Sequence, residues 1–242
     1  MFIKDGIILS NSNQLDIIEP YDGRQNYIDE LMNETPKSFI DIMIKRNEEI
    51  ARVLVDRNLS DKILLFMKTG VGPVELNLLE KTTDIKLMIL VDEDIEKLKI
   101  TKKSIEGNFS NINVLYICCE LDALPIKTNT IDIVIDFLAT FKNAFRSDID
   151  IYQSLNQYIK DKSSIIGLYL YFKKADMFSR LDRKKWAFFD NRAIKQKIKN
   201  LNYIETSDYE EAILQEGSNI NDFFKEEDKV HAKIMIFDRK SI

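Results

Sequence analysis

The sequence predicts a doubly wound α/β fold around a mostly parallel, seven-stranded sheet, with an antiparallel strand at the carboxyl terminus and helices at the amino terminus. Apolar runs alternate with helix-like stretches from residue 62 onward. The runs 86–91 and 131–135 are almost continuously apolar, which is typical of strands covered on both faces of a parallel sheet. Two later apolar runs, at 203–204 and 230–237, lie on either side of a long connection and predict a final antiparallel pair.

Residues 1–60 are expected to form a helical lid or brace. One helix is expected at about 24–33, and a second after Pro36 with Ser38 as its N-cap. The second helix places apolar residues at helical spacing, namely Ile40, Ile44, Ala51 and Leu54. Residues 2–9 precede both helices as a short strand or turn.

Residues 61–242 are expected to form the α/β domain. Glycines, prolines and short polar stretches separate its elements. Before the final pair, strands are expected at 62–68, 86–92, 113–119, 131–137 and 164–172, and helices at 73–82, 94–106, 147–160 and about 190–200.

The composition is that of a soluble, folded protein. A chain of 242 residues, 45% hydrophobic and 31% charged, fits one large domain or a domain with a small appendage, and it is too apolar to be disordered. The longest apolar runs fall well short of the ~18 residues that span a bilayer. The amino terminus lacks the pattern of a signal peptide. We expect a cytoplasmic protein with no membrane partner, while the sequence gives no indication of its oligomeric state.

Histidine and cysteine are scarce. The chain has only Cys118 and Cys119, which are adjacent, and a single histidine, His231. This set excludes a zinc site built from Cys and His, and we expect no metal. His231 lies in an expected strand, where we interpret it as an ordinary strand residue, so no catalytic residue is indicated.

A glycine turn and a distant carboxylate form the most informative pattern. Thr69, Gly70 and Gly72 follow an apolar run and open an expected helix, and the next apolar run ends at Asp92, beside Glu93. A buried strand, a glycine turn and a carboxylate about twenty residues later are typical of an adenosine-type cofactor site. The glycines let the backbone approach a ligand closely, and the carboxylate can accept both ribose hydroxyls.

A third segment makes a family resemblance specific. The stretch Asn113-Val-Leu-Tyr-Ile-Cys-Cys-Glu120-Leu-Asp-Ala-Leu124-Pro125 ends a strand on an acid and turns at Leu-Pro, and the next strand opens with Ile131-Asp132. Together with the glycine turn and Asp92, this resembles a class I S-adenosylmethionine-dependent methyltransferase of the large small-molecule group that carries a "gDaxxLPF…FDxV" segment. The resemblance covers about residues 38–172.

The resemblance implies S-adenosylmethionine as cofactor and methyl transfer to a small-molecule acceptor. In that family the glycine turn passes under the methionine part, the acid after the second strand holds the ribose, and the acid after the third meets the adenine amino group. Carried over by position, the implied cofactor-binding residues are Thr69, Gly70 and Gly72 in the turn, Asp92 and Glu93 at the second strand, Glu120 and Leu121 at the third, and Asp136 and Phe137 near the methionine end at the fourth.

Two residues depart from the family pattern. Phe66 stands where the first motif usually has an acid, and Lys68 where it has another glycine. A lysine there repels a sulfonium unless it turns toward the carboxylate of the cofactor. The loop 160–164 also lacks the Pro-Gly-Gly that the family often has. Two alternatives stay open: a non-catalytic protein of the same fold whose methionine pocket these two side chains fill, and, less favoured, an NAD-dependent Rossmann oxidoreductase.

Charge is segregated in the carboxyl-terminal third. Residues 173–199 contain ten bases and three acids, whereas 205–228 contain nine acids and one base. Aromatic residues accompany the basic stretch, namely Phe172, Phe178, Trp186, Phe188 and Phe189. Recognition of an anionic acceptor, including RNA, is one interpretation. We favour a solvated helical face with core aromatics, because the net charge is −5; core packing is also expected for Tyr169 and Tyr171.

Overall fold

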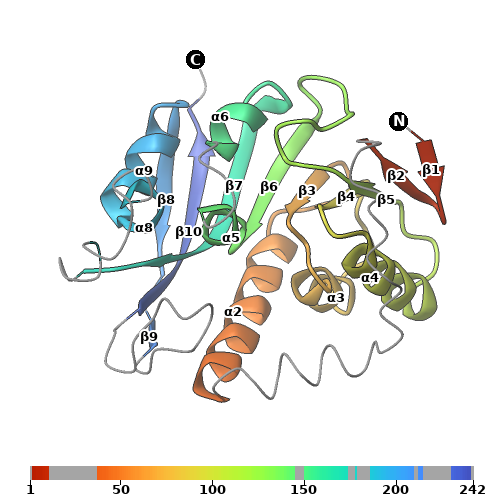
Figure 1. The fold of residues 1–242 in the computed structure, drawn as a ribbon, viewed down its shortest axis with the longest axis horizontal. Helices are drawn as coiled ribbons and strands as arrows, with labels where there is room; N and C mark the ends of the chain where they lie inside the picture. Colours follow the sequence, from red (N-terminus) through yellow and green to blue (C-terminus); the bar gives the residue numbers. More distant parts are fainter. Residues whose placement is uncertain are drawn as a thin grey trace.

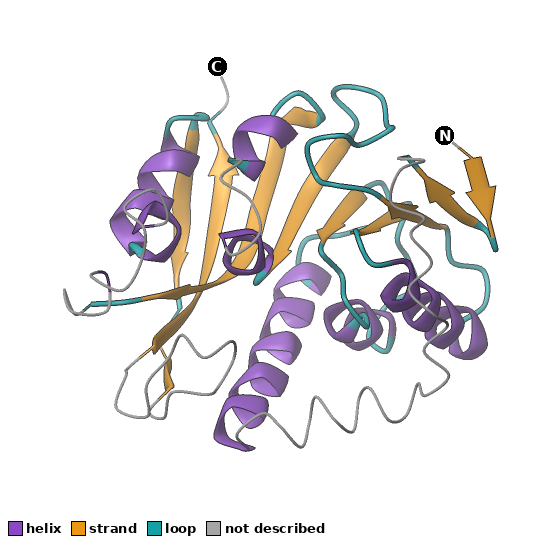
Figure 2. Ribbon diagram, viewed as in Figure 1, coloured by secondary structure: helices purple, strands orange, loops and turns teal. Residues whose placement is uncertain are grey.

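The strands form one continuous twisted sheet (Figure 1, Figure 2). The computed structural model describes residues 2–10, 37–144, 150–173, 178, 186–209, 212–214 and 230–240. The strands are β1 (Phe2–Lys4), β2 (Ile7–Leu9), β3 (Ile63–Met67), β4 (Leu87–Asp92), β5 (Val114–Cys118), β6 (Ile131–Phe137), β7 (Ile159–Tyr171), β8 (Tyr203–Asp208), β9 (Ala212–Leu214) and β10 (Val230–Arg239). The helices are α2 (Lys37–Val55), α3 (Pro73–Leu79), α4 (Ile95–Asn108), α5 (Ala139–Ala144), α6 (Ile151–Leu155), α8 (Trp186–Phe189) and α9 (Asn191–Lys199).

The sheet has the predicted mixed character. Its order is β1-β2-β5-β4-β3-β6-β7-β10-β8, and β9 also pairs with β10. The strands from β2 to β7 in this order are parallel, while β10 is antiparallel to both β7 and β8. The described sheet contains ten strands rather than the predicted seven, because β1 and β2 extend it beyond β5 and β9 adds a short strand against β10.

The strands β1 and β2, which extend the sheet beyond β5, form a hairpin with a two-residue turn. Asp5 and Gly6 both have positive φ, 52° and 75°, which is the backbone of a type I′ turn and suits an Asp-Gly pair. The turn lets Ile7 and Leu9 of β2 reach the core, where both are buried. The described part of residues 1–60 therefore packs with the α/β domain, and the lid predicted for this region stays a proposal.

Alternate side chains of the central strands enter two cores, one on each face of the sheet. One core joins Phe66 of β3 and Leu90 of β4 to α2, α3 and α4. The other joins Leu65 of β3 and Val91 of β4 to α6 and α9. This covering of both faces confirms the predicted doubly wound arrangement. No helix in the described part of the chain is long and apolar enough to cross a membrane.

Helix α2 confirms the second amino-terminal helix with two corrections. It begins at Lys37, so Ser38 lies inside it instead of serving as the N-cap. Ala51 and Leu54 are fully buried, whereas Ile44 is 48% exposed. In that part of the helix Ile42 and Met43 pack against the core instead. The helix predicted at about 24–33 lies outside the described residues.

The region before β7 differs from the prediction. A helix was expected over 147–160, but α6 ends at Leu155 and β7 begins at Ile159 rather than at residue 164. The polar residues that resemble a loop form a bulge, because the pairing of β6 with β7 shifts register there. Lys160 fixes this bulge through its Nζ, which lies 2.8 Å and 2.9 Å from the two carboxylate oxygens of Asp132.

Candidate functional site

The turn between β3 and α3 lies at the carboxyl end of the parallel strands. Gly70 and Gly72 have φ of 61° and 75°, a left-handed backbone that glycine adopts without strain. A Cβ on Gly72 would lie 2.6 Å from Cγ2 of Thr101 on α4. Gly72 is therefore required by the packing of α4 against the turn.

Replacing Gly72 with alanine is expected to lower the free energy of unfolding by about 2 kcal/mol, as measured by urea denaturation. The left-handed backbone accounts for part of this cost and the clash with Thr101 for the rest. Adding Thr101→Ser, which removes Cγ2 and keeps the hydroxyl, should recover part of the loss. Gly107→Ala is the matched control, since nothing lies within 4 Å of its added Cβ, and it should be stabilising.

The predicted carboxylate and the glycine turn do meet. Oδ2 of Asp92 accepts the backbone N–H of Gly70 at 2.9 Å, and Oδ1 accepts the N–H of Asp94 at 3.0 Å. The hydroxyl of Thr101 donates to the carbonyl of Gly70 at 2.9 Å, so the turn is held from both sides. Asp92 itself is 6% exposed.

Glu120 and Leu121 come to the same edge of the sheet. They follow β5, and the N–H of Cys119 donates to the carbonyl of Asp92 at 3.2 Å, which aligns the ends of β4 and β5. Leu121 is buried and Glu120 is half-buried. Residues of three adjacent strand ends, β3, β4 and β5, thus lie side by side as predicted for a site at the carboxyl edge.

Lys68 forms an ion pair across this edge. Its backbone has φ of 48°, and its Nζ lies 2.5 Å from Oε1 of Glu93. The side chain of Lys68 is only 5% exposed and that of Glu93 is 21% exposed. Phe66, the other departure from the family pattern, is buried in the core. A buried charge is tolerated only with a partner, and Glu93 supplies one for Lys68.

A small cavity lies beneath the turn. Its volume is about 10 Å³, room for about one water molecule. Glu75 of α3 borders the cavity, is 2% exposed, and accepts a hydrogen bond from the hydroxyl of Thr69. The full lining is Phe66, Met67, Lys68, Thr69, Pro73, Val74, Glu75, Ile135 and Phe137. The predicted residues Thr69 and Phe137 thus come together here. No sequence motif indicated Glu75 as a residue of this site.

Asp136 is not brought to this cavity. Its carboxyl group is fully buried among α5, α6 and β7, where it accepts hydrogen bonds from the hydroxyls of Thr140 and Tyr152 and from the N–H of Thr140 at 3.1 Å. The Tyr152 hydroxyl lies 2.5 Å from that of Tyr169. Burial raises the pKa of Asp136, against the opposing effect of these hydrogen bonds. Position 136 thus faces the second core, and a place for Asp136 beside the methionine end of a cofactor stays a prediction.

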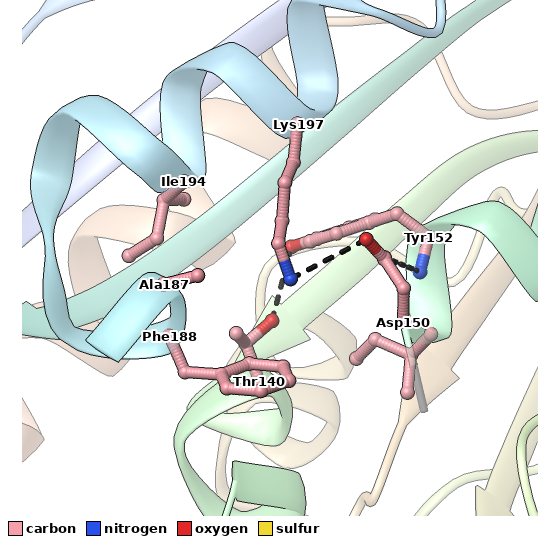
Figure 3. A pocket seen from close by; sticks show the side chains of 8 residues that line it. Thr140, Asp150, Tyr152, Ala187, Phe188, Ile194 and Lys197 are labelled. Carbon is pink, nitrogen blue, oxygen red and sulfur yellow. Dashed lines mark hydrogen bonds and ion pairs between the residues drawn. The ribbon is translucent and has the colours of Figure 1, made fainter. Parts of the chain in front are cut away.

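A second small cavity lies beside this cluster (Figure 3). It also measures about 10 Å³ and is bordered by Thr140 and Tyr152. Lys197 closes one side, with its Nζ 3.3 Å from the carboxylate of Asp150 and 4.2 Å from the ring centre of Phe188. The cavity has room for about one water molecule and no substrate.

The described part of the basic stretch favours the core interpretation of its aromatics. Phe172, Phe188 and Phe189 are buried, whereas Trp186 is 38% exposed. Lys195 pairs with Glu205 of the acidic stretch at 2.6 Å. Tyr169 and Tyr171 are both buried, as expected. The remaining bases, at 174, 180 and 183–185, lie outside the described residues.

No metal centre is found among the residues that the structure describes: no three side chains of His, Cys, Asp or Glu are placed to share an ion. Burial raises the pKa of the Cys118 thiol to about 11 and that of Cys119 to about 12. Both thiols therefore stay protonated at neutral pH, which makes them poor nucleophiles.

Comparison with solved structures identifies the fold. The YcgJ protein from Bacillus subtilis superposes with a TM-score of 0.58 at 9% identity, covering 80% of this chain and 99% of the other. A SAM-dependent methyltransferase from Methanosarcina mazei gives 0.54 at 9% identity, covering 77% and 96%. Geranyl diphosphate C-methyltransferase from Streptomyces coelicolor A3(2), solved with Mg²⁺, geranyl-S-thiolodiphosphate and S-adenosyl-L-homocysteine, gives 0.57 at 10% identity, covering 78% and 75%. The chain has the class I methyltransferase fold.

The methyltransferase fold accounts for the strand order and for the antiparallel strand β10 between β7 and β8. No protein-family model matches the chain, and no curated protein sequence matches it. The likeness is thus one of fold, and the site must be argued from its own residues.

Proposed function

We propose that the protein binds S-adenosylmethionine and transfers its methyl group to a small-molecule acceptor in the cytoplasm. The observation that carries this proposal is the contact between Asp92 and Gly70, 2.9 Å long, at the carboxyl edge of a methyltransferase fold. An ionised carboxylate offers about four lone-pair sites. Asp92 can therefore keep its two backbone N–H bonds and still accept the ribose hydroxyls.

The residues at this edge fit an adenosyl group. Asp92 would hold the ribose, Glu120 would meet the adenine amino group, and Leu121 supplies an apolar surface beside the ring. The bound cofactor would supply an electrophilic methyl group that needs no general base. The chain would then orient the acceptor and exclude water.

Calorimetry with S-adenosylmethionine and S-adenosylhomocysteine tests the proposal. We expect heat of binding with a dissociation constant below about 100 μM for the homocysteine product, together with a raised melting temperature. Absence of heat and of any thermal shift at millimolar ligand would end the proposal. Transfer itself is tested by incubating the protein with methyl-labelled cofactor and fractionated small-molecule extract, with RNA in a parallel sample.

A non-catalytic role is the second candidate, and the buried Lys68 favours it. The ammonium of Lys68 and the ring of Phe66 occupy the region where the family pattern has a glycine and an acid, and the remaining cavity holds about one water molecule. The double variant Lys68→Gly/Phe66→Asp separates the candidates. A gain of cofactor affinity in this variant supports the non-catalytic protein, whereas a loss supports the enzyme.

A further inference from the structure

The carboxyl group of Asp136 joins four elements of the fold. Asp136 lies near the end of β6, and its carboxyl group accepts the N–H of Thr140 on α5 at 3.1 Å and the hydroxyl of Tyr152 on α6. The Tyr152 hydroxyl lies 2.5 Å from the hydroxyl of Tyr169 on β7. These four residues are here called the Asp136 cluster. Asp136 is fully buried, and the two tyrosines are 3% and 2% exposed.

Two neighbouring residues show what this arrangement demands of the chain. Gly167 lies in the buried part of β7, and a Cβ there would lie 2.7 Å from the Tyr169 hydroxyl. Only glycine therefore lets the Tyr169 ring lie across the strand and reach the cluster. Leu138, directly after β6, has φ of 62°, a left-handed backbone that is strained for leucine. Such a conformation persists only where its surroundings hold it, and the adjoining Asp136 carboxyl group is placed to do so.

The cavity beside the cluster offers water a path to it (Figure 3). Thr140 and Tyr152 border the cavity on the buried side, and Asp150 and Lys197 also line it. The side chains of Lys197 and Asp150 are 27% and 30% exposed, so this side faces solvent. The cavity has room for about one water molecule. A water there can pass the Asp136 proton to solvent by way of the Tyr152 hydroxyl.

We propose that the Asp136 cluster is a proton-linked switch for the end of β6. While the carboxyl group is neutral, the four elements stay joined and Leu138 keeps its left-handed backbone. When the proton leaves to solvent, the buried charge draws water into the cluster, and the turn at Phe137 and Leu138 loosens. Phe137 borders the cavity beneath the glycine turn, so ionisation of Asp136 weakens ligand binding there. This effect on binding rests on the proposed function.

The direction of the switch follows from burial. Burial raises the pKa of Asp136, against the hydrogen bonds from Thr140 and Tyr152. Burial also raises the pKa values of Tyr152 and Tyr169 well above their usual value of 10.0, so both phenols stay protonated. The neutral carboxyl group dominates below its folded-state pKa and is lost as the pH rises through that value. Ligand affinity is therefore expected to fall with rising pH.

Other charged and titratable groups surround the cluster and must be controlled. Among the described residues, Asp150 and Lys197 lie beside the cavity, at the start of α6 and on α9. Lys233 and His231 of β10 are paired with Tyr169 and Tyr171 of β7, on the same face of the sheet as the cluster. A comparison of variants at position 136 within one protein separates the Asp136 proton from these groups.

Calorimetry with S-adenosylhomocysteine on the full-length protein, from about pH 5 to about pH 9, tests the switch. Asp136→Asn keeps a neutral side chain of the same shape and cannot ionise. We expect the affinity of the wild type, relative to this variant, to fall at least about tenfold with rising pH. A tenfold fall means that the ligand raises the pKa of Asp136 by about one unit. Titration of the ligand and of other side chains cancels in the ratio.

A second variant moves the midpoint of the fall. Tyr152→Phe removes a hydroxyl that stabilises the ionised carboxyl group, so the midpoint should rise by at least about half a pH unit. Tyr116→Phe is the matched control, because the buried Tyr116 hydroxyl has no hydrogen-bond partner among the described residues. His231→Gln controls for the histidine. Both controls should leave the midpoint unchanged, and melting curves establish that each variant is folded.

The outcomes separate this inference from the proposed function. If the wild type and Asp136→Asn bind S-adenosylhomocysteine with the same pH dependence, the switch is overturned while cofactor binding stands. An unmoved midpoint in Tyr152→Phe overturns it as well. If S-adenosylhomocysteine does not bind the wild type at any pH, the proposed function fails, and the proposed effect of the switch on binding fails with it.

Discussion

Replacing Asp92 with alanine is expected to weaken S-adenosylhomocysteine binding at least about 100-fold and to lower the free energy of unfolding by about 3 kcal/mol. The side chain holds the N–H groups of Gly70 and Asp94 at 2.9 Å and 3.0 Å, and hydrogen bonds to a charged group contribute ~1.5–3 kcal/mol each. The proposed ribose contacts are lost with the same atoms. Calorimetry measures the first effect and urea denaturation the second.

Asp122→Ala is the matched control for this experiment. Asp122 is an exposed acid in the turn after β5, and its replacement should change stability by less than about 0.5 kcal/mol and leave affinity unaltered. A folded Asp92→Ala protein that binds the ligand like the wild type would show that Asp92 only supports the turn. The proposed ribose contact of Asp92 would then be wrong, while cofactor binding itself would stand.

Replacing Asp136 with alanine is expected to have the largest effect on stability, a loss of about 4 kcal/mol. The change removes the shared acceptor of the Thr140 and Tyr152 hydroxyls and leaves these donors buried without it. The urea midpoint measures the loss. Asp161→Ala, an exposed acid on β7, is the control and should stay near the wild-type midpoint. A loss under about 1 kcal/mol for Asp136→Ala would contradict a supporting role for the cluster.

The same carboxyl group predicts a dependence of stability on pH. Burial raises the pKa of Asp136 above its usual value of 3.8, so the folded state binds this proton more tightly than the unfolded state does. The resulting stabilisation is fully present below pH 3.8 and is lost as the pH rises through the pKa of the folded state. Asp136→Asn removes the titration.

Urea denaturation of the wild type and of Asp136→Asn across the acid range measures this pH-dependent contribution of Asp136 to the free energy of unfolding. The free energy of unfolding of the wild type, relative to the Asn variant, should fall as the pH rises from below 3.8 toward neutrality and then level off. Parallel curves over this range would show that the folded-state pKa is not raised. Because the two proteins differ only at position 136, the contributions of all other titrating groups cancel in the difference between their free energies of unfolding.

Strong local signals made much of the fold predictable. The strands β3, β4, β5 and β6 are almost continuously apolar in sequence, which is typical of buried strands. Their predicted boundaries agree with the structure to within one residue. The Asp5-Gly6 pair is also a strong hairpin signal. Its strands have only three residues each, and pairing with β5 stabilises them, a long-range contact that local patterns do not specify.

The site residues also differ in whether a local signal or a long-range contact places them. Gly70 and Asp92 could be paired in advance, because parallel strands place their carboxyl ends at one edge and the spacing between glycine turn and acid is characteristic. Asp136 could not be placed from its position alone. Its face depends on the alternation within β6, and at the end of a strand the chain can turn either way.

The sequence by itself determined the alternation of strands and helices from β3 to β6, the glycine turn and the acid that meets it, because these follow from periodicity and from backbone conformations that few residues adopt. Only the tertiary structure decided which partners the ionisable side chains of Lys68, Glu75 and Asp136 contact. Burial of a charge depends on which partner three-dimensional packing brings within hydrogen-bonding distance, and that partner lies on another element of the fold.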